Sequence, residues 1–404
     1  MFGIKSGAAR AVKNAVKSIP TYPQRPQKVF TVLGVETSAD DSCAAVVTSD
    51  RRILSNVVIR QDEYHAPTGG IHTLVAIEAH QRNLPGAVQK ALDDAGMSVQ
   101  DVDGIAYTRG PGMTGCLAVG SNAVKSLAAS LKKPLVGVNH MQAHALTPFL
   151  TEPADMLPTF PFLSLLVTGG HTLLLLVESP RDFKILATTT DEAIGRAIDK
   201  VARLLKLPWG ERGLGASLEE YVKKGPPEGF DIEKGYEIPL YSTPMHRRLE
   251  FSFAGVHSAT EMFLREREGN IDECTRYATA YAFQKATVRQ LEDKLKLALR
   301  ACKQNRVPIR HLVVSGGVAC NMYLRQRLSE FLEEQDEYYP IELIYPPVEM
   351  CTDNAAMIAW ASIDRFLTGD TDPYSTDLVP QWSVEDFFFY PESSVSPANP
   401  KPIS

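Results

Sequence analysis

The sequence predicts a mixed α/β protein made of two related lobes, because one strand–turn–strand pattern occurs twice and helical segments separate the strands. Residues 29–35 form a β-prone run that enters a polar turn at 36–42, and residues 43–47 return as a second strand. The pattern recurs in 162–167 and 173–177, on either side of a glycine turn. The repeat favours a duplicated domain that carries a β-hairpin over one continuous sheet.

A third strand–turn unit comes later in the chain. The strand 311–314 runs into a glycine-rich segment at 315–321, and a helix opens at Met322. Apolar residues at a 3.6-residue period predict further helices between the strands. These helices cover about 77–95, 118–131, 192–207 and 272–302.

The order of these segments predicts the domain boundaries. The first lobe is expected to span 29–152 and to be joined by a C-terminal part at about 346–370. The second lobe then covers 153–345, since residues 153–161 are the best boundary between the two hairpins. Residues 371–404 are rich in Pro and Ser and are expected to form a peripheral tail.

Composition excludes several classes of protein. The chain has 404 residues, 44% of them hydrophobic and 22% charged, which is ordinary for a globular protein with a full core. No apolar run reaches the roughly 18 residues that span a bilayer, so we expect no membrane segment. Six scattered cysteines without a Cys-x-x-Cys pair indicate reduced thiols. The net charge of -6 argues against a generic nucleic-acid binder.

The charge is unevenly distributed along the chain. Residues 1–28 carry six basic residues and no acidic one, and without them 36 basic residues face 48 acidic ones, a net charge of -12. The basic residues alternate with small and apolar ones at helical spacing, which is typical of a mitochondrial transit peptide and predicts a location in the matrix. A disordered basic tail or a nucleic-acid-binding arm is the alternative.

Two histidines, His140 and His144, are spaced to face the same side of a helix, where two imidazoles can bind one metal ion. The pair is not a zinc-protease motif, because Met141 stands where that motif needs a glutamate. Spacing alone is a weak signal, and a third ligand is required. Two histidines and one carboxylate suit zinc or iron(II), which ligand type cannot distinguish.

Glycine pairs follow two of the predicted strands, at Gly169-Gly170 and Gly316-Gly317. Their backbone amides could approach a phosphate or a ribose. The alternative is a pair of tight turns that need a positive φ. Asp199, inside a predicted helix, would by default lie on a solvated face.

A basic stripe is predicted between Lys285 and Arg310, where eight basic residues face two acidic ones. A solvated helix surface is the default, but such a stripe could also bind a phosphate backbone. The candidate residues for such a contact are Arg247, Arg248, Lys285, Arg289, Lys296 and Arg300.

Eight short motifs occur in one order between Leu33 and Ala361. They are Gly34-Val35-Glu36-Thr37-Ser38, Gly110-Pro111-Gly112, Asn139-His140-Met141-Gln142-Ala143-His144, Val167-Thr168-Gly169-Gly170-His171-Thr172, Asp199-Lys200, Phe251-Ser252-Phe253-Ala254-Gly255, Ser315-Gly316-Gly317-Val318-Ala319-Cys320-Asn321 and Cys351-Thr352-Asp353-Asn354-Ala355-Ala356. Together they resemble the tRNA N6-adenosine threonylcarbamoyltransferase family, formerly called glycoproteases.

The resemblance implies a two-lobed actin-like, sugar-kinase-like fold and an acyltransferase. The family transfers threonylcarbamoyl from threonylcarbamoyl-AMP to N6 of adenosine 37 in tRNAs that read codons beginning with adenine. It implies one divalent metal per subunit, zinc or iron, and a separate synthase that supplies the adenylate. A homodimer is the simpler expectation for an organellar member.

Site residues follow from the resemblance by position. His140, His144 and Asp353 look like the metal ligands, and Asp40 and Asp41 match acidic positions implicated in catalysis. The remaining positions look like contacts to the adenylate. They are Val167, Thr168, Gly169, Gly170 and His171 on its phosphate side, Asp199, Gly215 and Glu219 at the ribose and Asn321 at the adenine.

The chain departs from the family pattern at several positions, including Ala39 in place of Cys and Asp41 in place of Glu. These departures and the basic leader resemble the mitochondrial branch of the family. Three other functions stay open: a metalloendopeptidase, an ATPase or sugar kinase of the same fold, and a non-enzymatic RNA-binding subunit.

Overall fold

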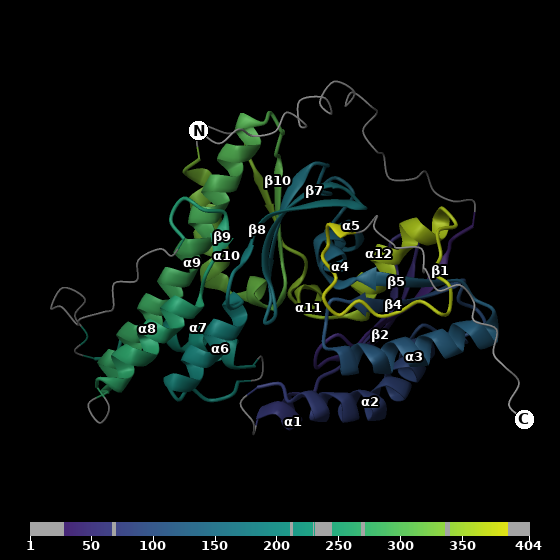
Figure 1. Cartoon of the computed structure of the whole chain (residues 1–404), viewed down its shortest axis with the longest axis horizontal. Helices are drawn as coiled ribbons and strands as arrows, with labels where there is room; N and C mark the ends of the chain where they lie inside the picture. The colour runs from purple at the N-terminus through teal and green to yellow at the C-terminus, as the bar shows by residue number, and fades with distance from the viewer. Residues whose placement is uncertain are drawn as a thin grey trace, which may run out of the picture.

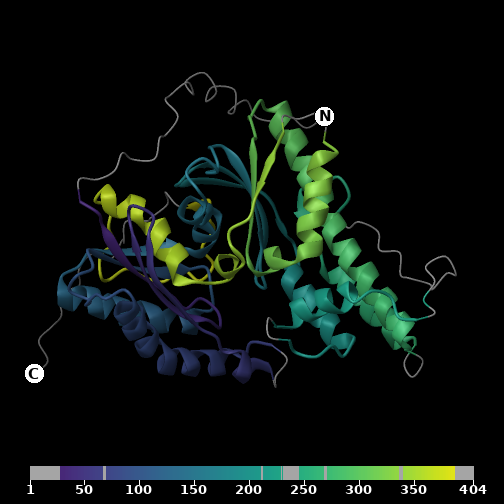
Figure 2. The same ribbon diagram turned by 180° about the vertical axis from the view of Figure 1, so that it is seen from behind.

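The computed structural model describes residues 28–66, 70–210, 213–228, 230, 245–267, 271–335 and 340–386. The predicted transit peptide, apart from Lys28, lies outside these residues. The described chain forms two β-sheets with helices between them and on both outer faces, and the two views in Figures 1 and 2 show the lobes on either side of the central helices. The predicted α/β class is confirmed.

The first sheet has five strands. Its hairpin strands pair antiparallel, whereas β1 pairs parallel with β4 and β4 pairs parallel with β5. In spatial order the strands are β3 (Ile53–Ile59), β2 (Ser42–Thr48), β1 (Thr31–Glu36), β4 (Gly104–Gly110) and β5 (Leu135–Asn139).

The second sheet has six strands and repeats this plan. Its hairpin strands are antiparallel, and its first strand pairs parallel with the next strand on the other side. In spatial order they are β11 (Glu342–Ile344), β10 (His311–Ser315), β6 (Phe162–Val167), β7 (Thr172–Ser179), β8 (Asp182–Thr189) and β9 (Glu250–Phe251).

The duplication is visible in the strand order. The order β8-β7-β6-β10-β11 in the second sheet matches β3-β2-β1-β4-β5 in the first, with the same pattern of parallel and antiparallel neighbours. This arrangement confirms the two-lobed actin-like fold that the resemblance implies. It also places the tips of the two hairpins, β1–β2 and β6–β7, at equivalent positions in the two lobes.

Two long helices cover the outer face of the first sheet. They are α2 (Thr73–Asp94) and α3 (Thr114–Leu131), which follow the short α1 (Asp62–His65) and β4. Leu84 of α2 and Val124 of α3 pack against Leu33 and Tyr107 of the sheet. This apolar contact fixes the outer side of the first lobe.

A layer of helices lies between the two sheets. It contains α4 (His140–Leu146), α5 (Pro148–Thr151) and α12 (Ala355–Leu367), with the short α11 (Val348–Cys351) before the last. At Gly34 of β1 an added Cβ would lie 2.5 Å from the carbonyl oxygen of Ala355 and 2.9 Å from Cβ of Ala359. The glycine therefore lets α12 lie directly on the first sheet.

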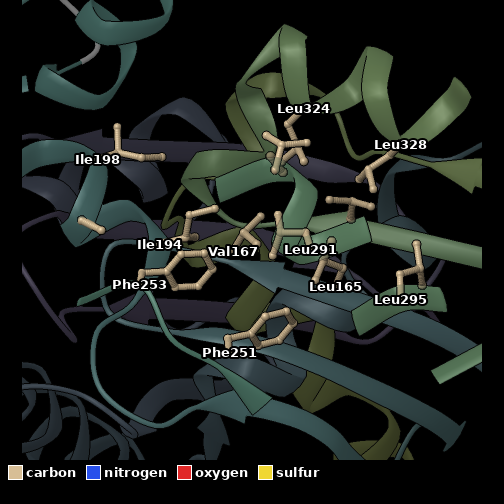
Figure 3. Close-up of a cluster of buried hydrophobic side chains, with 14 of the residues drawn as sticks. Leu165, Val167, Ile194, Ile198, Phe251, Phe253, Leu291, Leu295, Leu324 and Leu328 are labelled. Atoms are coloured by element: carbon tan, nitrogen blue, oxygen red, sulfur yellow. The ribbon is translucent and has the colours of Figure 1, made fainter. Parts of the chain in front are cut away.

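Among the described residues, five helices cover the far face of the second sheet. They are α6 (Ile194–Leu204), α7 (Gly213–Lys223), α8 (Ala254–Arg265), α9 (Glu273–Gln304) and α10 (Met322–Glu333), which follows a 3-10 turn at Gly317–Cys320. Figure 3 shows part of the core they form, in which Ile194 and Leu291 meet Leu165 and Val167 of β6. No helix of the described residues is both long and apolar enough to cross a membrane.

The segment after α12 packs on the first lobe, although the sequence predicts a peripheral tail from 371. Asp372 pairs with the buried Arg365 at 3.1 Å and accepts from the backbone N–H of Gly137 at 2.7 Å. The backbone of Val379 donates to the carbonyl of Arg109. Buried polar and apolar contacts thus hold 371–386 in place, and 387–404 lie outside the described residues.

Candidate metal centre and active site

The predicted metal ligands meet at the carboxyl ends of the strands, between the lobes. β1 ends at Glu36, β5 leads directly into His140, and Asp353 lies just before α12. Parallel strands bring their carboxyl ends to one edge of a sheet, which is where open α/β sheets bind ligands. Residues far apart in the chain therefore converge in one site.

His140, His144 and Asp353 lie close enough together to hold one ion. One ligand atom from each lies within 4.8 Å of the others. Oδ1 of Asp353 is 3.3 Å from Nε2 of His140 and 3.2 Å from Nε2 of His144. The two imidazole rings are nearly perpendicular, with their centroids 4.7 Å apart. The three groups that the resemblance names as ligands are thus brought together by the fold.

Groups behind each histidine orient its ring. Glu36 accepts a hydrogen bond from Nδ1 of His140 at 3.0 Å, and the hydroxyl of Ser315 lies 3.5 Å from Nδ1 of His144. The carboxylate of Glu36 is held in turn by the Thr108 hydroxyl and by the backbone N–H of Ser38. Metal-binding histidines usually have such partners on the nitrogen that faces away from the metal.

The electrostatics of the site favour a positive charge. Burial alone would lower the pKa of His140, but the carboxylates of Asp353 and Glu36 outweigh it and raise that pKa to about 10. One carboxylate thus faces each ring nitrogen of His140, Glu36 at Nδ1 and Asp353 at Nε2. Both histidines direct Nε2 toward Asp353, so the donor set fits a divalent cation of the zinc or iron class.

Side-chain caps anchor the two helices that carry the ligands. Asn139 accepts from the backbone N–H groups of Met141 and Gln142 at the start of α4, and it donates to the carbonyl of Trp382 at 3.3 Å. Asn354 accepts from the N–H of Met357 at the start of α12. Each cap satisfies backbone donors that the helix leaves free. The adjoining ligands are therefore fixed by rigid backbone.

The predicted catalytic residues Asp40 and Asp41 lie half-buried at the tip of the first hairpin. Burial raises the pKa of Asp40 to about 7, with smaller contributions from Asp353 and Asp62. Burial and the adjacent Asp40 raise the pKa of Asp41 well above its usual value. The contribution of Asp353 to both shifts places the pair within electrostatic reach of the three ligands. A carboxyl group poised near neutral pH suits acid–base work.

The second hairpin presents its glycine turn toward the same region. The hydroxyl of Thr168 accepts from the backbone N–H groups of Gly170 and His171, which closes the turn. Gly169 and Gly170 are exposed and have open space around them. Burial and the positive charge of His140 lower the pKa of His171 to about 4, so His171 is neutral beside the metal ligands.

The predicted adenylate contacts beyond the turn gather where α6, α7 and α10 meet. The backbone N–H of Gly215 donates to the carboxylate of Asp199, whose pKa burial raises to about 6. Glu219 accepts from the backbone N–H of Met322 at 2.6 Å, directly beside Asn321. Of these four, Asn321 lines a small pocket of about 10 Å³ between α6, α7, α9 and α10. The fold thus brings them together, and their roles remain predictions.

The predicted basic stripe lies elsewhere. Its four residues on α9 are exposed: Lys285, Arg289, Lys296 and Arg300. At 100° per residue, their side chains lie within about 60° of one another around the helix axis. Because α9 packs on the face of the second sheet that points away from the first lobe, the stripe is not beside the metal ligands. Arg247 and Arg248 are exposed nearby, in a segment that Lys294 of α9 holds through the carbonyl of Met245.

Sequence reasoning missed the groups that orient the ligands. Glu36 and Ser315 stand inside quoted motifs, yet neither was assigned a role. An acidic residue in an otherwise apolar strand is the signal that could have identified Glu36, because a buried carboxylate needs partners. His80, which the resemblance marks only weakly because the motif around it is not kept, is fully buried and bonds the Ser42 hydroxyl at 2.8 Å and the Ala39 carbonyl at 3.0 Å, so it braces the first hairpin tip.

Comparison with known proteins gives a consistent family. A sequence model described as tRNA N6-adenosine threonylcarbamoyltransferase matches residues 52–360. A protein of that name from Sphingopyxis alaskensis is 40% identical over 354 residues, covering 88% of this chain and 95% of its own length. A probable mitochondrial tRNA N6-adenosine threonylcarbamoyltransferase from Arabidopsis thaliana is 35% identical over 395 residues, covering 93% of this chain and 79% of its own.

Similarity to solved structures is weaker. The ROK hexokinase from Thermus thermophilus matches with a TM-score of 0.44 and 16% sequence identity, over 84% of this chain and all of its own. The family match and the two relatives each cover most of the chain, and the matched range 52–360 includes the three predicted metal ligands. The chain belongs to the tRNA N6-adenosine threonylcarbamoyltransferase family.

Proposed function

We propose that this protein transfers the threonylcarbamoyl group of threonylcarbamoyl-AMP to N6 of adenosine 37, in mitochondrial tRNAs that read codons beginning with adenine. The observation that carries the proposal is the convergence of two hairpin tips on His140, His144 and Asp353. One tip supplies two carboxyl groups and the other a glycine turn. Transfer of a group from an anionic donor needs both: carboxyl groups that can accept a proton, and backbone amides that can bind the phosphate.

The chemistry follows from the two substrates. The donor is a mixed carbamic–phosphoric anhydride, and the acceptor is a weakly basic exocyclic amine. A bond forms between N6 and the carbamoyl carbon, the bond from that carbon to the phosphate oxygen breaks, and AMP leaves. The amine must lose one proton, and we assign that proton to the carboxylate of Asp41.

The other residues hold the adenylate in place for the reaction. The Thr168–His171 turn binds the phosphate through backbone amides, and Asp199, Gly215 and Glu219 bind the ribose. Asn321 contacts the adenine. We further propose one zinc or iron ion per subunit on His140, His144 and Asp353; when bound, it supplies Lewis-acid stabilisation of the developing negative charge.

Location and partners follow from the leader and the surface. The leader and the mitochondrial name of the Arabidopsis relative support import into the mitochondrial matrix. A separate enzyme class must make the adenylate from threonine, bicarbonate and ATP.

We propose that the chain pairs with a second copy through the apolar groove between α2 and α3, whose walls include Leu84, Val88 and Val119. Light scattering of wild type and Val119→Glu tests this, and a monomeric wild type would contradict it.

The proposed tRNA contact is the basic stripe on α9, with Arg247 and Arg248. Because the protein without its leader is acidic, RNA must bind through a local cluster of cations. Reversal of Lys285 and Arg289 to Glu is expected to lower tRNA affinity and the salt dependence of binding, measured by filter binding at several salt concentrations. Unchanged affinity would show that RNA docks elsewhere.

The deciding assay uses purified protein, threonylcarbamoyl-AMP and an unmodified tRNA, with mass spectrometry of the nucleosides. Wild type should form threonylcarbamoyladenosine, and Asp41→Asn should reduce its rate by about 100-fold or more. Full activity in the double variant His140→Ala/His144→Ala would refute the metal role. Proteolysis that survives Asp41→Asn would favour a metalloendopeptidase, and ATP turnover without tRNA would favour an ATPase.

A further inference from the structure

Two cysteine thiols lie next to each other close to the candidate metal centre. Cys320 ends the 3-10 turn that precedes Asn321, and Cys351 ends α11, two residues before Asp353. The two thiols share a hydrogen bond, and this bond, together with burial, raises the pKa of Cys351. Neither residue forms a disulfide in the structure. Two sulfurs that are far apart in the chain thus meet beside a predicted metal ligand.

The segments that carry the two cysteines are in contact. Sγ of Cys320 lies 3.6 Å from the carbonyl oxygen of Val348, the first residue of α11. Sγ of Cys351 lies 3.3 Å from the carbonyl oxygen of Pro346, just before that helix. The backbones of the 3-10 turn and α11 also approach each other closely. The proximity of the two sulfurs therefore follows from the packing of two short elements.

Arg325 of α10 holds both segments. Its Nε donates to the carbonyl of Ala319 at 2.7 Å, directly before Cys320, and its Nη2 lies 3.8 Å from Sγ of Cys351. Its guanidinium lies over the ring of Tyr345, with Cζ 4.2 Å from the ring centroid. A cation beside a sulfur stabilises the negative charge that the sulfur carries when it attacks another sulfur. Arg325 thus favours a reaction between the two thiols.

The two sulfurs differ in their access to solvent. Cys320 is half-buried, whereas Cys351 is fully buried behind it. Cysteines that respond to oxidants are usually accessible and have a second cysteine within reach, which completes a disulfide. We propose that Cys320 and Cys351 are a redox-modification site, at which a peroxide forms a reversible disulfide that weakens metal binding by the neighbouring Asp353.

The proposed reaction takes two steps. The sulfur of Cys320 attacks one oxygen of hydrogen peroxide, the O–O bond breaks, and water leaves as a sulfenic acid forms. The sulfur of Cys351 then attacks the sulfur of Cys320, so that an S–S bond forms and the S–O bond breaks. The hydroxide that leaves takes the proton of Cys351 and becomes a second water. The two sulfurs together give up the two electrons that the peroxide gains.

The disulfide changes the spacing of the two segments. A sulfur–sulfur bond of about 2 Å is much shorter than a hydrogen bond between two thiols, so closing it draws the end of α11 toward the 3-10 turn. Asp353 follows only two residues later, and a metal ligand must keep its distance to the ion within about 0.2 Å. Metal affinity should therefore fall. This effect rests on the proposed function, because it assumes that the three predicted ligands bind a metal ion.

Peptide mapping tests whether the disulfide forms. Full-length wild type, Cys320→Ser and the control Cys274→Ser, which removes another half-buried cysteine at the start of α9, are treated with hydrogen peroxide and digested with trypsin. Trypsin places Cys320 and Cys351 in separate peptides, 311–325 and 328–365. Wild type and Cys274→Ser should give these peptides joined, two hydrogens lighter than their sum. Dithiothreitol should separate them, and Cys320→Ser should give no joined product.

Zinc titration against a chelator, after the peroxide is removed, tests the effect on the site. Peroxide should lower the zinc affinity of wild type and Cys274→Ser by about 10-fold or more, and dithiothreitol should restore it. Cys320→Ser should keep its affinity throughout. Dithiothreitol does not repair methionine sulfoxide, for which dedicated reductases exist, so recovery excludes oxidation of the exposed Met322 as the cause.

Two results would overturn the inference. One is the absence of the joined peptides from oxidised wild type, and the other is an unchanged zinc affinity although the peptides are joined. A reduced wild type that binds no zinc refutes the metal site itself, which is the separate failure of the proposed function.

Discussion

At the scale of single residues, Glu36 shows how hydrogen bonds stabilise a buried charge beside the candidate metal centre. Glu36 is 1% exposed and would be costly to bury alone, but it accepts bonds from Thr108, Ser38 and His140. Through His140 it fixes which ring nitrogen faces Asp353. The carboxylate therefore orients His140, one of the three predicted metal ligands.

Glu36→Gln tests that role. It removes the charge behind His140 but keeps the shape of the side chain, so the fold should persist while metal affinity falls by about 10- to 100-fold. Competition with a chelator measures the affinity, and circular dichroism checks the fold. Glu349→Gln, at an exposed position on α11, is the control and should bind metal like wild type. Equal affinity in both variants would contradict an orienting role for Glu36.

Asp199, one of the proposed adenylate contacts, affects how the stability of the protein depends on pH. Burial raises its folded-state pKa from 3.8 to about 6, so the folded protein binds more protons than the unfolded chain between these values. Stability is thus lost as the pH rises through this window. Asp199→Asn should match wild type near pH 4 and be more stable above pH 6, by up to about 3 kcal/mol. Urea unfolding between pH 4 and pH 8 measures this, and a constant difference would refute it.

Some residues of the candidate site can be predicted from the sequence, and others cannot. His140 and His144 are recognisable from their spacing, whereas Asp353, more than two hundred residues away, is found only through the resemblance. Ser315 could not be placed behind His144 from the sequence, because a serine in a glycine turn is ordinary until its neighbours are known. Its significance comes from what surrounds it in three dimensions, which no local pattern encodes.

Among the helices and strands, the sequence predicts those whose apolar residues recur at a clear period. The strand 162–167 is confirmed as β6, and the predicted helix at 272–302 is α9 within two residues at its end. The apolar period does not predict α12, since nearly all of its side chains are buried and it has no polar face. β9 was missed because two residues carry too little pattern.

The short helix α4 depends on its cap more than a long helix would. Asn139→Ala removes two bonds to the first turn and the bond to Trp382, so it should lower the free energy of unfolding by about 1–2 kcal/mol. Because His140 is the first residue of α4, metal affinity should fall as well. Denaturant unfolding and metal titration measure the two effects. Asn305→Ala, at the exposed end of α9, serves as the control, and an equal loss there would contradict the proposed importance of the α4 cap.

At the scale of the whole molecule, the lobes and the C-terminal segment form one body around the site. The segment 371–386 contacts the ends of β4 and β5 and the start of α4. The sequence predicts a peripheral tail here, because the prolines and serines of this segment are typical of loosely packed tails. Irregular backbone can still be fixed when buried side chains and backbone bonds hold it.

Two truncations separate the parts of that segment. A chain ending at residue 386 should be as stable as the full protein if the contacts described here suffice. A chain ending at 370 loses Asp372 beside the buried Arg365, and it should be destabilised by about 3 kcal/mol or more. Thermal unfolding of both chains, with the leader kept, provides the measurement. Similar melting temperatures for the 370 chain and the full protein would show that the segment contributes no stability.

The position of α12 has a consequence for how the chain is made. The first sheet is complete by Asn139, but the helix that fills its inner face begins only at Ala355, after the whole second sheet. A ribosome releases the chain from its N-terminus, and domains fold as units as they emerge. The second lobe, continuous in sequence, can therefore fold during translation, whereas the first waits with its inner apolar face uncovered. We expect chaperones that shield such surfaces to engage the nascent chain between these two points.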